Sequence, residues 1–363
     1  MTASVDRLAF CTLGMFIIDE IEHLNSDAPE QRIIGGAGTY AALGARLAAG
    51  GQNAQHVGWI VDMGSDFPAE LRSLIDTWGT KCIFRTDVTR LTTTAWNGYG
   101  HNEHRAFKYL TPKLRLDENS LSEEQVLAQS FHMVCSPERC MSLIRGIMAR
   151  RNVLVPNEER PVFVWEPIPD LCTPEEFDRL REAIALVDVV SPNAEELVSF
   201  FPAASSGDDR LSQEMMADKL LRVDSDKYMN AALVIREGAL GCTTYVGRKK
   251  LHLGAFHRDS SKVRDPTGGG NTFLGALAMG MTGRVAPVES GVVKEDLWVG
   301  ENSQHNLLLG LLHATVAAAY AIEQVGMPGV STTDPAVWNG ESYLGRYHSY
   351  LDSEKTHVQG QLQ

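Results

Sequence analysis

Residues 264–273 read RDPTGGGNTF, and an apolar run at 274–281 follows at once. Three consecutive glycines disfavour a helix interior or a strand, because each glycine costs about 1 kcal/mol relative to alanine. The glycines therefore predict a loop, and the polar pair at 271–272 before helically spaced apolar residues predicts that this loop opens a buried helix. Backbone N–H groups at a helix N-terminus attract anions, so the stretch indicates a phosphate site. A plain flexible turn is the alternative, but it would need neither the flanking residues 265–267 nor a buried helix.

The composition narrows the class of protein. The 363-residue chain has 44% hydrophobic and 22% charged residues, which is typical of a globular protein with an ample core. A net charge of −13 and the lack of clustered Lys and Arg argue against nucleic acid or an anionic membrane as a partner. The six cysteines include no C-x-x-C pair and predict reduced thiols. No basic leader is present and no apolar run reaches about 18 residues, so we expect a soluble cytoplasmic protein.

Short apolar segments alternate with helix-length stretches, which indicates an α/β fold with a mostly parallel sheet and helices on both faces. Segments at about 15–34 and 92–110 are instead hairpin-like and leave no room for crossover helices. They predict a small antiparallel β lid beside the main sheet. We expect residues 1–340 to form one domain and residues 341–363 a polar, loosely held tail. An exposed lid edge offers a surface through which two copies could form a homodimer.

A second glycine cluster, at 35–38, opens an alanine-rich helix and contains the pattern G-x-G-x-x-A. That pattern is compatible with a dinucleotide-binding fingerprint, which also requires a preceding core strand and an acidic residue about 20 positions later. The segment before Gly35 is short, and Asp62 fits the acidic position only loosely. A nicotinamide-dependent oxidoreductase is therefore one alternative, and a plain cluster at a helix start is another.

Two further patterns place polar side chains where strands end. Asp19 lies among apolar residues, where a carboxylate is costly to bury without hydrogen bonds. It is a candidate acceptor for two vicinal hydroxyls, or else a solvated loop acid. Asn193 and Glu196 follow a short strand and are three residues apart, which puts both on one helix face, where their oxygens suit Mg²⁺. The same pair is also a good N-terminal capping pattern.

Together these patterns resemble the signatures of the ribokinase-like (PfkB) carbohydrate kinases over nearly the whole chain. Asp265, Gly268 and Gly270 match the family's D-T-x-G-A-G-D loop, whereas Gly269 is a variant and Asn271 stands at the position of the catalytic base. The form D-P-T-G-G-G-N resembles a fungal, maintenance-of-killer-type subgroup. The resemblance implies a ribokinase-like α/β fold and an ATP-dependent phosphotransferase that acts on a hydroxyl of a sugar, nucleoside or polyol.

The resemblance also implies roles for the candidate residues. The catalytic loop would comprise Asp265, Gly268, Gly269, Gly270 and Asn271. The substrate would contact Asp19, Gly35, Gly36 and Tyr40, the last of which stands where the family often has asparagine. The nucleotide would contact Asn193, Arg236, Gly238, Gly241, Thr267 and Thr315. Mg²⁺ would be held by Glu196 and Asn193, so ATP and Mg²⁺ are the expected cofactors.

Asparagine at position 271 limits the chemistry, because an amide oxygen accepts a hydrogen bond but is too weakly basic to take the proton of an attacking hydroxyl. General-base catalysis is worth about 10² to 10⁴ in rate, so its loss slows turnover without abolishing transfer outright. Two hypotheses follow. One is a slow kinase in which Asp265 could supply the base, and the other is an inactive pseudokinase that binds nucleotide or polyol as a sensor or interaction module.

Overall fold

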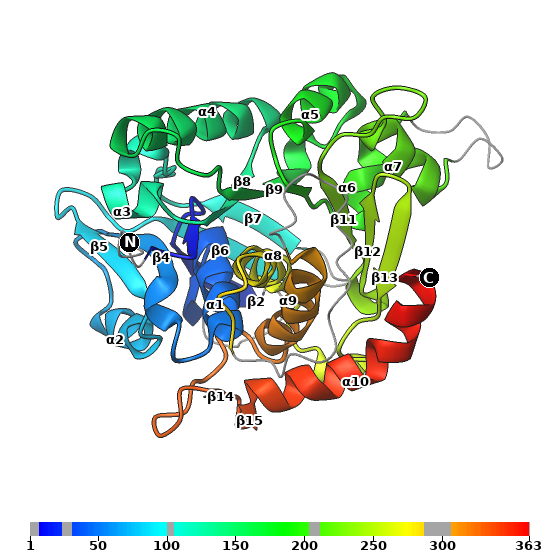
Figure 1. The fold of residues 1–363 in the computed structure, drawn as a ribbon. Coiled ribbons are helices and arrows are strands. Elements are labelled where there is room, and N and C mark those ends of the chain that lie inside the picture. Colours follow the sequence, from blue (N-terminus) through cyan, green and yellow to red (C-terminus); the bar gives the residue numbers. More distant parts are fainter. Residues whose placement is uncertain (1–6, 24–30, 100–104, 203–210, 287–305, 363) are drawn as a thin grey trace, which may run out of the picture.

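The computed structural model describes residues 7–23, 31–99, 105–202, 211–286 and 306–362 (Figure 1). Among these, a nine-stranded sheet lies at the centre in the order β13-β12-β11-β10-β9-β8-β1-β4-β5. The pairings from β5 to β11 are parallel, and β12 and β13 add antiparallel at one edge. The strands are β1 (Phe10–Thr12), β4 (Val57–Met63), β5 (Lys81–Thr86), β8 (Ser130–Cys135), β9 (Val162–Pro167), β10 (Val189–Val190), β11 (Ala232–Arg236), β12 (Cys242–Val246) and β13 (Lys249–Leu253).

Helices cover both faces of the sheet, which confirms the expected α/β architecture (Figure 1). One face carries α1 (Ala37–Ala49), α2 (Ala69–Thr77), α8 (Gly269–Met281), α9 (Leu307–Ile322) and α10 (Tyr343–Leu362). The other carries α3 (Glu123–Val126), α4 (Pro137–Leu154), α5 (Phe177–Ile184), α6 (Ala194–Ser199) and α7 (Gln213–Leu221). Successive strand residues alternate between the two cores, so Trp59 enters the first and Ile60 the second. In the described part of the chain, no helix has the length and hydropathy that a membrane span requires.

The expected lid is a separate small sheet in the order β3-β2-β6-β7. Its strands are β2 (Ile17–His23), β3 (Gln31–Gly35), β6 (Thr94–Tyr99) and β7 (Arg105–Tyr109). The two outer pairings are antiparallel, whereas β2 and β6 run parallel at the centre. The central pair is parallel because the chain returns to the lid from the main-sheet strand β5 and not through a hairpin. Residues 24–30 and 100–104 of the expected lid lie outside the described residues.

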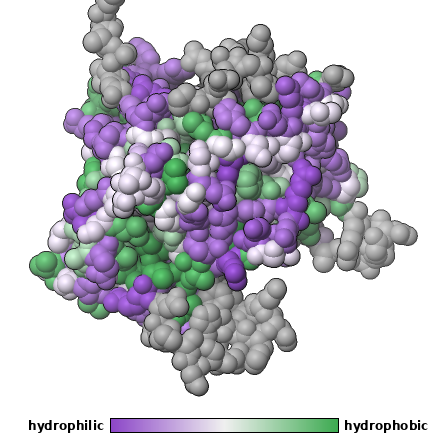
Figure 2. Space-filling model, turned by 90° about the horizontal axis from the view of Figure 1, so that it is seen from below, coloured by the Kyte–Doolittle hydropathy of each residue, from purple (hydrophilic) through white to green (hydrophobic). Residues whose placement is uncertain are grey.

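The C-terminal segment is not the loosely held tail that its polar composition predicted. A short hairpin of β14 (Val337–Trp338) and β15 (Glu341–Ser342) leads into α10, which packs on β13 and α9. One face of α10 enters the core through Tyr343, Tyr347 and Leu351. Figure 2 looks at the molecule from this side and shows mostly hydrophilic side chains across its centre and right. The helix is amphipathic, so its average composition concealed its buried face.

The last turn of α10 also contacts the outer edge of the main sheet. The side-chain amide of Gln361 accepts from the backbone N–H of His252 at 2.8 Å and donates to the carbonyl oxygen of the same residue at 2.9 Å. His252 belongs to the edge strand β13. One glutamine side chain thus satisfies both backbone groups that this edge residue turns away from the sheet.

Two glycines set how closely α1 and α8 approach each other. A Cβ at Gly44 would lie 1.9 Å from the carbonyl oxygen of Thr272, and a Cβ at Gly275 would lie 1.9 Å from that of Ala41. The helices therefore cross backbone against backbone, with no side chain between them at these points. This crossing fixes the first turns of α8 beside α1, so Tyr40, which follows the first glycine cluster, lies against Gly268 of the second.

Candidate active site

The loop before α8 is held by its own backbone. The N–H groups of Arg264 and Asp265 donate to the carbonyl oxygen of Ile322, at the end of α9, at 2.8 and 3.2 Å. The buried Asp265 side chain accepts from the N–H of Thr267 at 2.9 Å through Oδ1. The loop is therefore tied to α9 and closed on itself, and the first role of Asp265 is to shape it.

Gly268 ends this loop in the left-handed conformation, with φ at +79°, and serves as the N-cap of α8 without any capping side chain. The first-turn N–H groups of Gly270 and Asn271 therefore find no acceptor on a side chain of the N-cap residue. A Cβ at Gly268 would lie 2.2 Å from the ring of Tyr40, which is itself buried. Glycine is therefore required at position 268 for two reasons: the left-handed backbone conformation and the closeness of the Tyr40 ring. The positive end of α8 thus has no side-chain cap, which suits it to an anion.

Asp19, on β2 of the lid, lies over the glycine cluster before α1. Its Oδ1 accepts from Nδ2 of Asn97 on β6 at 2.9 Å, and its Oδ2 would be 1.9 Å from a Cβ at Gly35. Only 8% of Asp19 is exposed. Burial, and then the charge of Asp19, raises the pKa of Tyr109 on β7, which places this phenol near the carboxylate. The lid therefore presents an acid, an amide and a phenol at one place.

Sequence reasoning found Asp19 but missed Asn97 and Tyr109. Asn97 is buried on a strand whose neighbours include Thr94 and Ala95, and a buried amide in a strand was the available signal. Its partner could not be inferred, because β2 and β6 meet only through the parallel lid pairing.

Arg236, at the end of β11, joins two carboxylates from neighbouring strand ends. Its Nη2 donates to Glu166 Oε1 at 2.6 Å, to the carbonyl oxygen of Ser191 at 3.0 Å and to Glu196 Oε2 at 3.4 Å. Its Nη1 would lie 2.1 Å from a Cβ at Gly270. The guanidinium thus fills the space between the two glutamates and the first turn of α8.

Asn193 and Glu196 form a capping box at the start of α6. Asn193 Oδ1 accepts from the N–H of Glu196 at 2.8 Å, and Glu196 Oε2 accepts from the N–H of Asn193 at 2.7 Å. Burial raises the pKa of Glu196, although the Asn193 N–H and the charge of Arg236 act in the opposite direction. Both expected magnesium ligands are therefore already engaged by the protein.

The residues present do not fit a magnesium ion as they stand. Mg²⁺ is usually bound by one or two carboxylates, by substrate phosphates and by water. Here the pair of Glu166 and Glu196 already shares the guanidinium of Arg236. Within the described residues, no group of three or more His, Cys, Asp or Glu side chains is arranged to hold a metal. Glu166 Oε2 is buried with no hydrogen-bond partner among the described residues, so a metal would find one open oxygen there but would lie beside the guanidinium of Arg236.

Two other titratable groups lie near the carboxylates and are inert at neutral pH. Burial, and then the charge of Arg236, lowers the pKa of His132 to about 3, so this imidazole stays neutral. Its Nδ1 pairs with the Thr12 hydroxyl at 2.9 Å. Burial, and then the charges of Glu196 and Glu166, raises the pKa of Cys172 to about 12. Neither group can replace an aspartate as a base: the imidazole is too weakly basic, and the thiol stays protonated.

Asn271 lies in the first turn of α8, and its Oδ1 is buried with no hydrogen-bond partner among the described residues. A buried acceptor without a donor is unusual in a folded protein and calls for an explanation. The hydroxyl of a bound ligand would supply such a donor. The position is therefore suited to orient a hydroxyl, although the amide cannot remove its proton.

The two glycines of the expected nucleotide turn differ in the free space around them. Gly238 has φ at +57° and no atom within 4 Å of an added Cβ, so a ligand can approach its backbone closely. Gly241 has φ at +98°, and an added Cβ would lie 2.0 Å from the carbonyl oxygen of Leu253, so its role is structural. Thr315 is buried in α9, where its hydroxyl donates to the carbonyl oxygen of Leu311 at 3.1 Å.

The strand before the glycine cluster at 35–38 contradicts the dinucleotide-binding alternative. Gly36 follows β3, a strand of the lid and not of the main sheet. An added Cβ at Gly36 would lie 2.4 Å from the carbonyl oxygen of Met15, and the N–H of Gly38 donates to that same oxygen at 3.0 Å. These glycines therefore pack the lid against α1 and do not form a pyrophosphate turn after a core strand.

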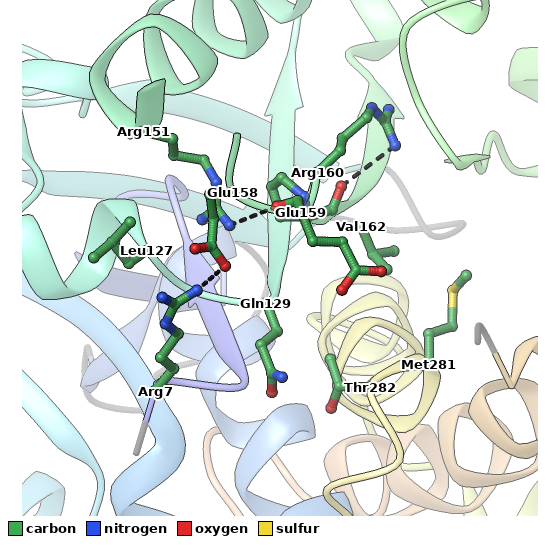
Figure 3. A pocket seen from close by; sticks show the side chains of 11 residues that line it. Arg7, Leu127, Gln129, Arg151, Glu158, Glu159, Arg160, Val162, Met281 and Thr282 are labelled. Carbon is green, nitrogen blue, oxygen red and sulfur yellow. Dashed lines mark hydrogen bonds and ion pairs between the residues drawn. The ribbon is translucent and has the colours of Figure 1, made fainter. Parts of the chain in front are cut away.

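A pocket of about 120 Å³ lies at the opposite end of α8, beside Met281 (Figure 3). A helix of 13 residues separates it from Gly268, which corresponds to about 20 Å. Its arginines are already occupied within the protein. Arg151 donates to the carbonyl oxygens of residues 126 and 128, Arg160 pairs with Asp188, and Arg7 pairs with Glu158, as Figure 3 shows for the last pair. The pocket is separate from the glycine loop.

This geometry places an uncapped helix start after a glycine loop, and a lid with a buried carboxylate, on one α/β scaffold. The chain belongs to the pfkB family of carbohydrate kinases, whose model matches residues 32–284. Protein MAK32 of Saccharomyces cerevisiae is 35% identical over 358 residues, which cover 94% of this chain and 91% of that protein. That similarity confirms the expected fungal subgroup. The name of the yeast protein states no enzymatic activity.

Solved structures show the same fold at low sequence identity. Ribokinase from Giardia lamblia has a TM-score of 0.63 and 13% identity, with 95% of this chain and 99% of that chain covered. A putative ribokinase II from E. coli, in complex with ATP and Mg²⁺, has a TM-score of 0.61 and 15% identity over the same shares. The central sheet, the two helical layers and the small lid sheet are thus those of the ribokinase-like fold.

Proposed function

We propose that the chain is an ATP-dependent phosphotransferase of the ribokinase type, slowed by Asn271, that acts on a hydroxyl of a sugar, nucleoside or related polyol. One observation carries this proposal: the buried Asp19 carboxylate and the uncapped first turn of α8 are joined through α1 and Tyr40. A hydroxyl acceptor and an anion site are what a phosphoryl transfer to an alcohol requires. Membership of the pfkB family supports the same reaction class.

The roles follow from chemistry. Asp19 would accept hydrogen bonds from two hydroxyls of the acceptor. The hydrogen bond from Asn97 to Oδ1 would hold the carboxylate in its orientation. The N–H groups of Gly270 and Asn271 would stabilise the transferring phosphoryl group, because their dipoles are fixed in position before the charge develops. The nucleotide would extend from there toward Gly238, whose backbone is open, and Thr267 and Thr315 are the further proposed contacts.

The missing base sets the expected rate. Phosphoryl transfer depends mainly on positioning and electrostatics, which this site could still provide. Asn271 can orient the attacking hydroxyl through its buried Oδ1 but leaves the proton to water or to another group. Asp265 is the nearest acid in the sequence of the loop, but its Oδ1 already accepts from Thr267. We therefore expect turnover to be lowered by roughly 10² to 10⁴ relative to a chain with aspartate at position 271.

The second candidate is an inactive relative that binds nucleotide or polyol as a sensor or interaction module. The observation that favours it is again Asn271, because the substitution removes proton transfer and leaves the binding surfaces intact. The two candidates share every contact except the chemical step, so binding alone cannot separate them.

The experiment is ADP release from ATP, with and without Mg²⁺, across pentoses, hexoses, nucleosides and polyols, for the wild type and Asn271→Asp. We expect the variant to turn over at least one acceptor roughly 10² to 10⁴ times faster than the wild type. Asn119→Asp adds the same charge at an exposed site and is the control. Turnover by the wild type above background identifies a slow kinase, and turnover by Asn271→Asp alone identifies a binding module. If neither consumes ATP with any acceptor, the proposal of phosphotransfer is wrong.

A further inference from the structure

The guanidinium of Arg236 stands at the boundary between the phosphate loop and two acidic side chains. Its three hydrogen bonds to Glu166, Ser191 and Glu196 all come from Nη2. Its Nη1 lies on the other side, against Gly270, and its Nε is buried with no partner among the described residues. Nη2 thus anchors the side chain, while Nη1 lies against the first turn of α8.

The charges in this cluster are poorly screened by water. The exposed fractions of the three side chains are 14% for Arg236, 11% for Glu166 and 8% for Glu196. Charges in such surroundings interact more strongly than on the surface. Arginine also keeps its proton under all ordinary conditions and matches phosphate oxygens with its planar fork. The protein therefore holds a permanent cation where an anion would bind.

A divalent ion would compete with this arginine for the same two carboxylates, of which one oxygen, Glu166 Oε2, is buried without a partner among the described residues. Glu196 Oε2 already accepts from the N–H of Asn193, and Glu166 Oε1 already accepts from Arg236. A metal that took these two carboxylates would leave the guanidinium with only the Ser191 carbonyl as a hydrogen-bond partner in a nearly buried place, which is unfavourable. The arrangement supports one cation between the carboxylates and the phosphate loop, and that cation is part of the chain.

We propose that Arg236 takes the place of a divalent metal ion at this site, so that the nucleotide polyphosphate binds at α8 without Mg²⁺. The inference rests on the proposed function, because it assumes that a nucleotide occupies the first turn of α8. It departs from the expectation that Glu196 and Asn193 hold Mg²⁺. The carboxylates serve instead to position the guanidinium.

The test measures binding by titration calorimetry of the β,γ-imido analogue of ATP, in excess EDTA and in excess Mg²⁺. For the wild type we expect two dissociation constants that agree within about threefold. Arg236→Gln should weaken binding in EDTA tenfold or more and regain affinity when Mg²⁺ is added, because both carboxylates are then free. Arg236→Lys keeps the charge and should retain part of the metal-free binding. Arg160→Gln breaks an arginine–aspartate pair at the opposite end of α8 from Gly268 and should bind like the wild type.

The possible results distinguish the role of Arg236 from the proposed function of the chain. Wild-type binding that requires Mg²⁺ overturns the role of Arg236 and leaves the proposed function standing. Equal affinity of Arg236→Gln and wild type in EDTA also overturns the role of Arg236 and leaves the proposed function standing. Absence of binding in both buffers overturns the nucleotide site itself and the inference with it. Thermal unfolding reports whether Arg236→Gln is folded, and if it is not, the wild-type comparison and Arg236→Lys decide.

Discussion

At the scale of single residues, the lid carboxylate decides which ligands the site can hold. Asp19 is buried, accepts a hydrogen bond from Asn97 and lies close to Tyr109. A buried carboxylate gains most from ligand donors that replace water. Neutral molecules with adjacent hydroxyls are therefore favoured over acids, which would meet the charge of Asp19 directly.

This gives a prediction for the acceptor site. Asp19→Asn keeps the shape but loses the charge, and hydrogen bonds to charged groups are worth about 1.5 to 3 kcal/mol each. We expect KM for the acceptor that is most active with Asn271→Asp to rise about 10- to 100-fold in the Asp19→Asn, Asn271→Asp double variant. KM for ATP should change little. Steady-state kinetics with varied acceptor measures both.

The control comes from the same strand. Glu22 is exposed on β2, three residues from Asp19 and hence on the opposite face. Glu22→Gln removes the same charge from the lid without touching the proposed contact. An equal rise in KM for both variants would mean that the general field of the lid, and not the contact of Asp19, binds the acceptor.

At the scale of elements, the site depends on how α8 is seated. The helix crosses α1 through Gly44 and Gly275, and its N-terminal turn carries the phosphate loop. Because the crossing is backbone against backbone, a shift of one helix moves the loop relative to the lid by the same amount. The sequence predicted both glycine clusters but not this contact, since Gly44 reads only as one more small residue in an alanine-rich helix.

Gly44→Ala tests the crossing. The added Cβ would lie 1.9 Å from the carbonyl oxygen of Thr272, so the helices must separate. We expect the free energy of unfolding to fall by about 1 to 3 kcal/mol, as in overpacked cores. Urea denaturation followed by circular dichroism measures the change.

Gly345→Ala is the matched control, because it lies in α10 and its added Cβ has no neighbour nearer than Ser342 at 3.5 Å. That change should leave stability the same or raise it by up to about 1 kcal/mol through helix propensity. A loss of stability at position 345 equal to that at 44 would contradict the close-approach argument.

The helix α10 shows where element prediction failed and why. Its buried positions Tyr343, Tyr347, Tyr350, Leu351 and Val358 recur at helical spacing, so the pattern was present in the sequence. Polar residues on the exposed face outnumber them and lowered the average hydropathy. The buried Glu354 also interrupts the stripe, and only the structure shows that it accepts from Arg258 at 2.9 Å.

At the scale of the whole molecule, two buried histidines couple folding to pH. Burial lowers the pKa of His132 and of His313 to about 3, whereas an unfolded histidine titrates near 6.5. Between these values the unfolded chain binds protons that the folded chain does not. The free energy of unfolding therefore falls as pH decreases from about 6.5 to about 3, by up to about 1.4 kcal/mol per pH unit for each histidine.

His313→Phe should reduce that slope by up to about 1.4 kcal/mol per pH unit while keeping a ring beside Tyr347, whose centroid lies 4.3 Å from that of His313. Urea midpoints and slopes at several pH values in this window give the dependence. His348→Phe removes an exposed histidine from α10 and serves for comparison. A wild-type stability that stays constant across the window contradicts the neutral, buried state of these imidazoles.

The whole molecule also shows the limit of reading sites from sequence. The fold class, the glycine loop before α8 and the closeness of Asn193 to Glu196 followed from local patterns, because each pattern lies within a few residues. The pair of Arg236 and Glu166 did not, because 70 residues separate them and they meet only where β9 and β11 flank β10. Local sequence therefore predicted Glu196 and Asn193 as metal ligands, and the arginine that binds Glu196 and Glu166 became visible only in three dimensions.

The contact of Gln361 with His252 bears on how this protein avoids joining other chains. A sheet edge with free N–H and carbonyl groups is a template on which foreign strands can add. At β13 one side-chain amide already fills the place of such a strand. If the final turn of α10 unwound or were clipped, the main sheet would gain an open end, and we would expect the result as self-association long before any change at the phosphate loop.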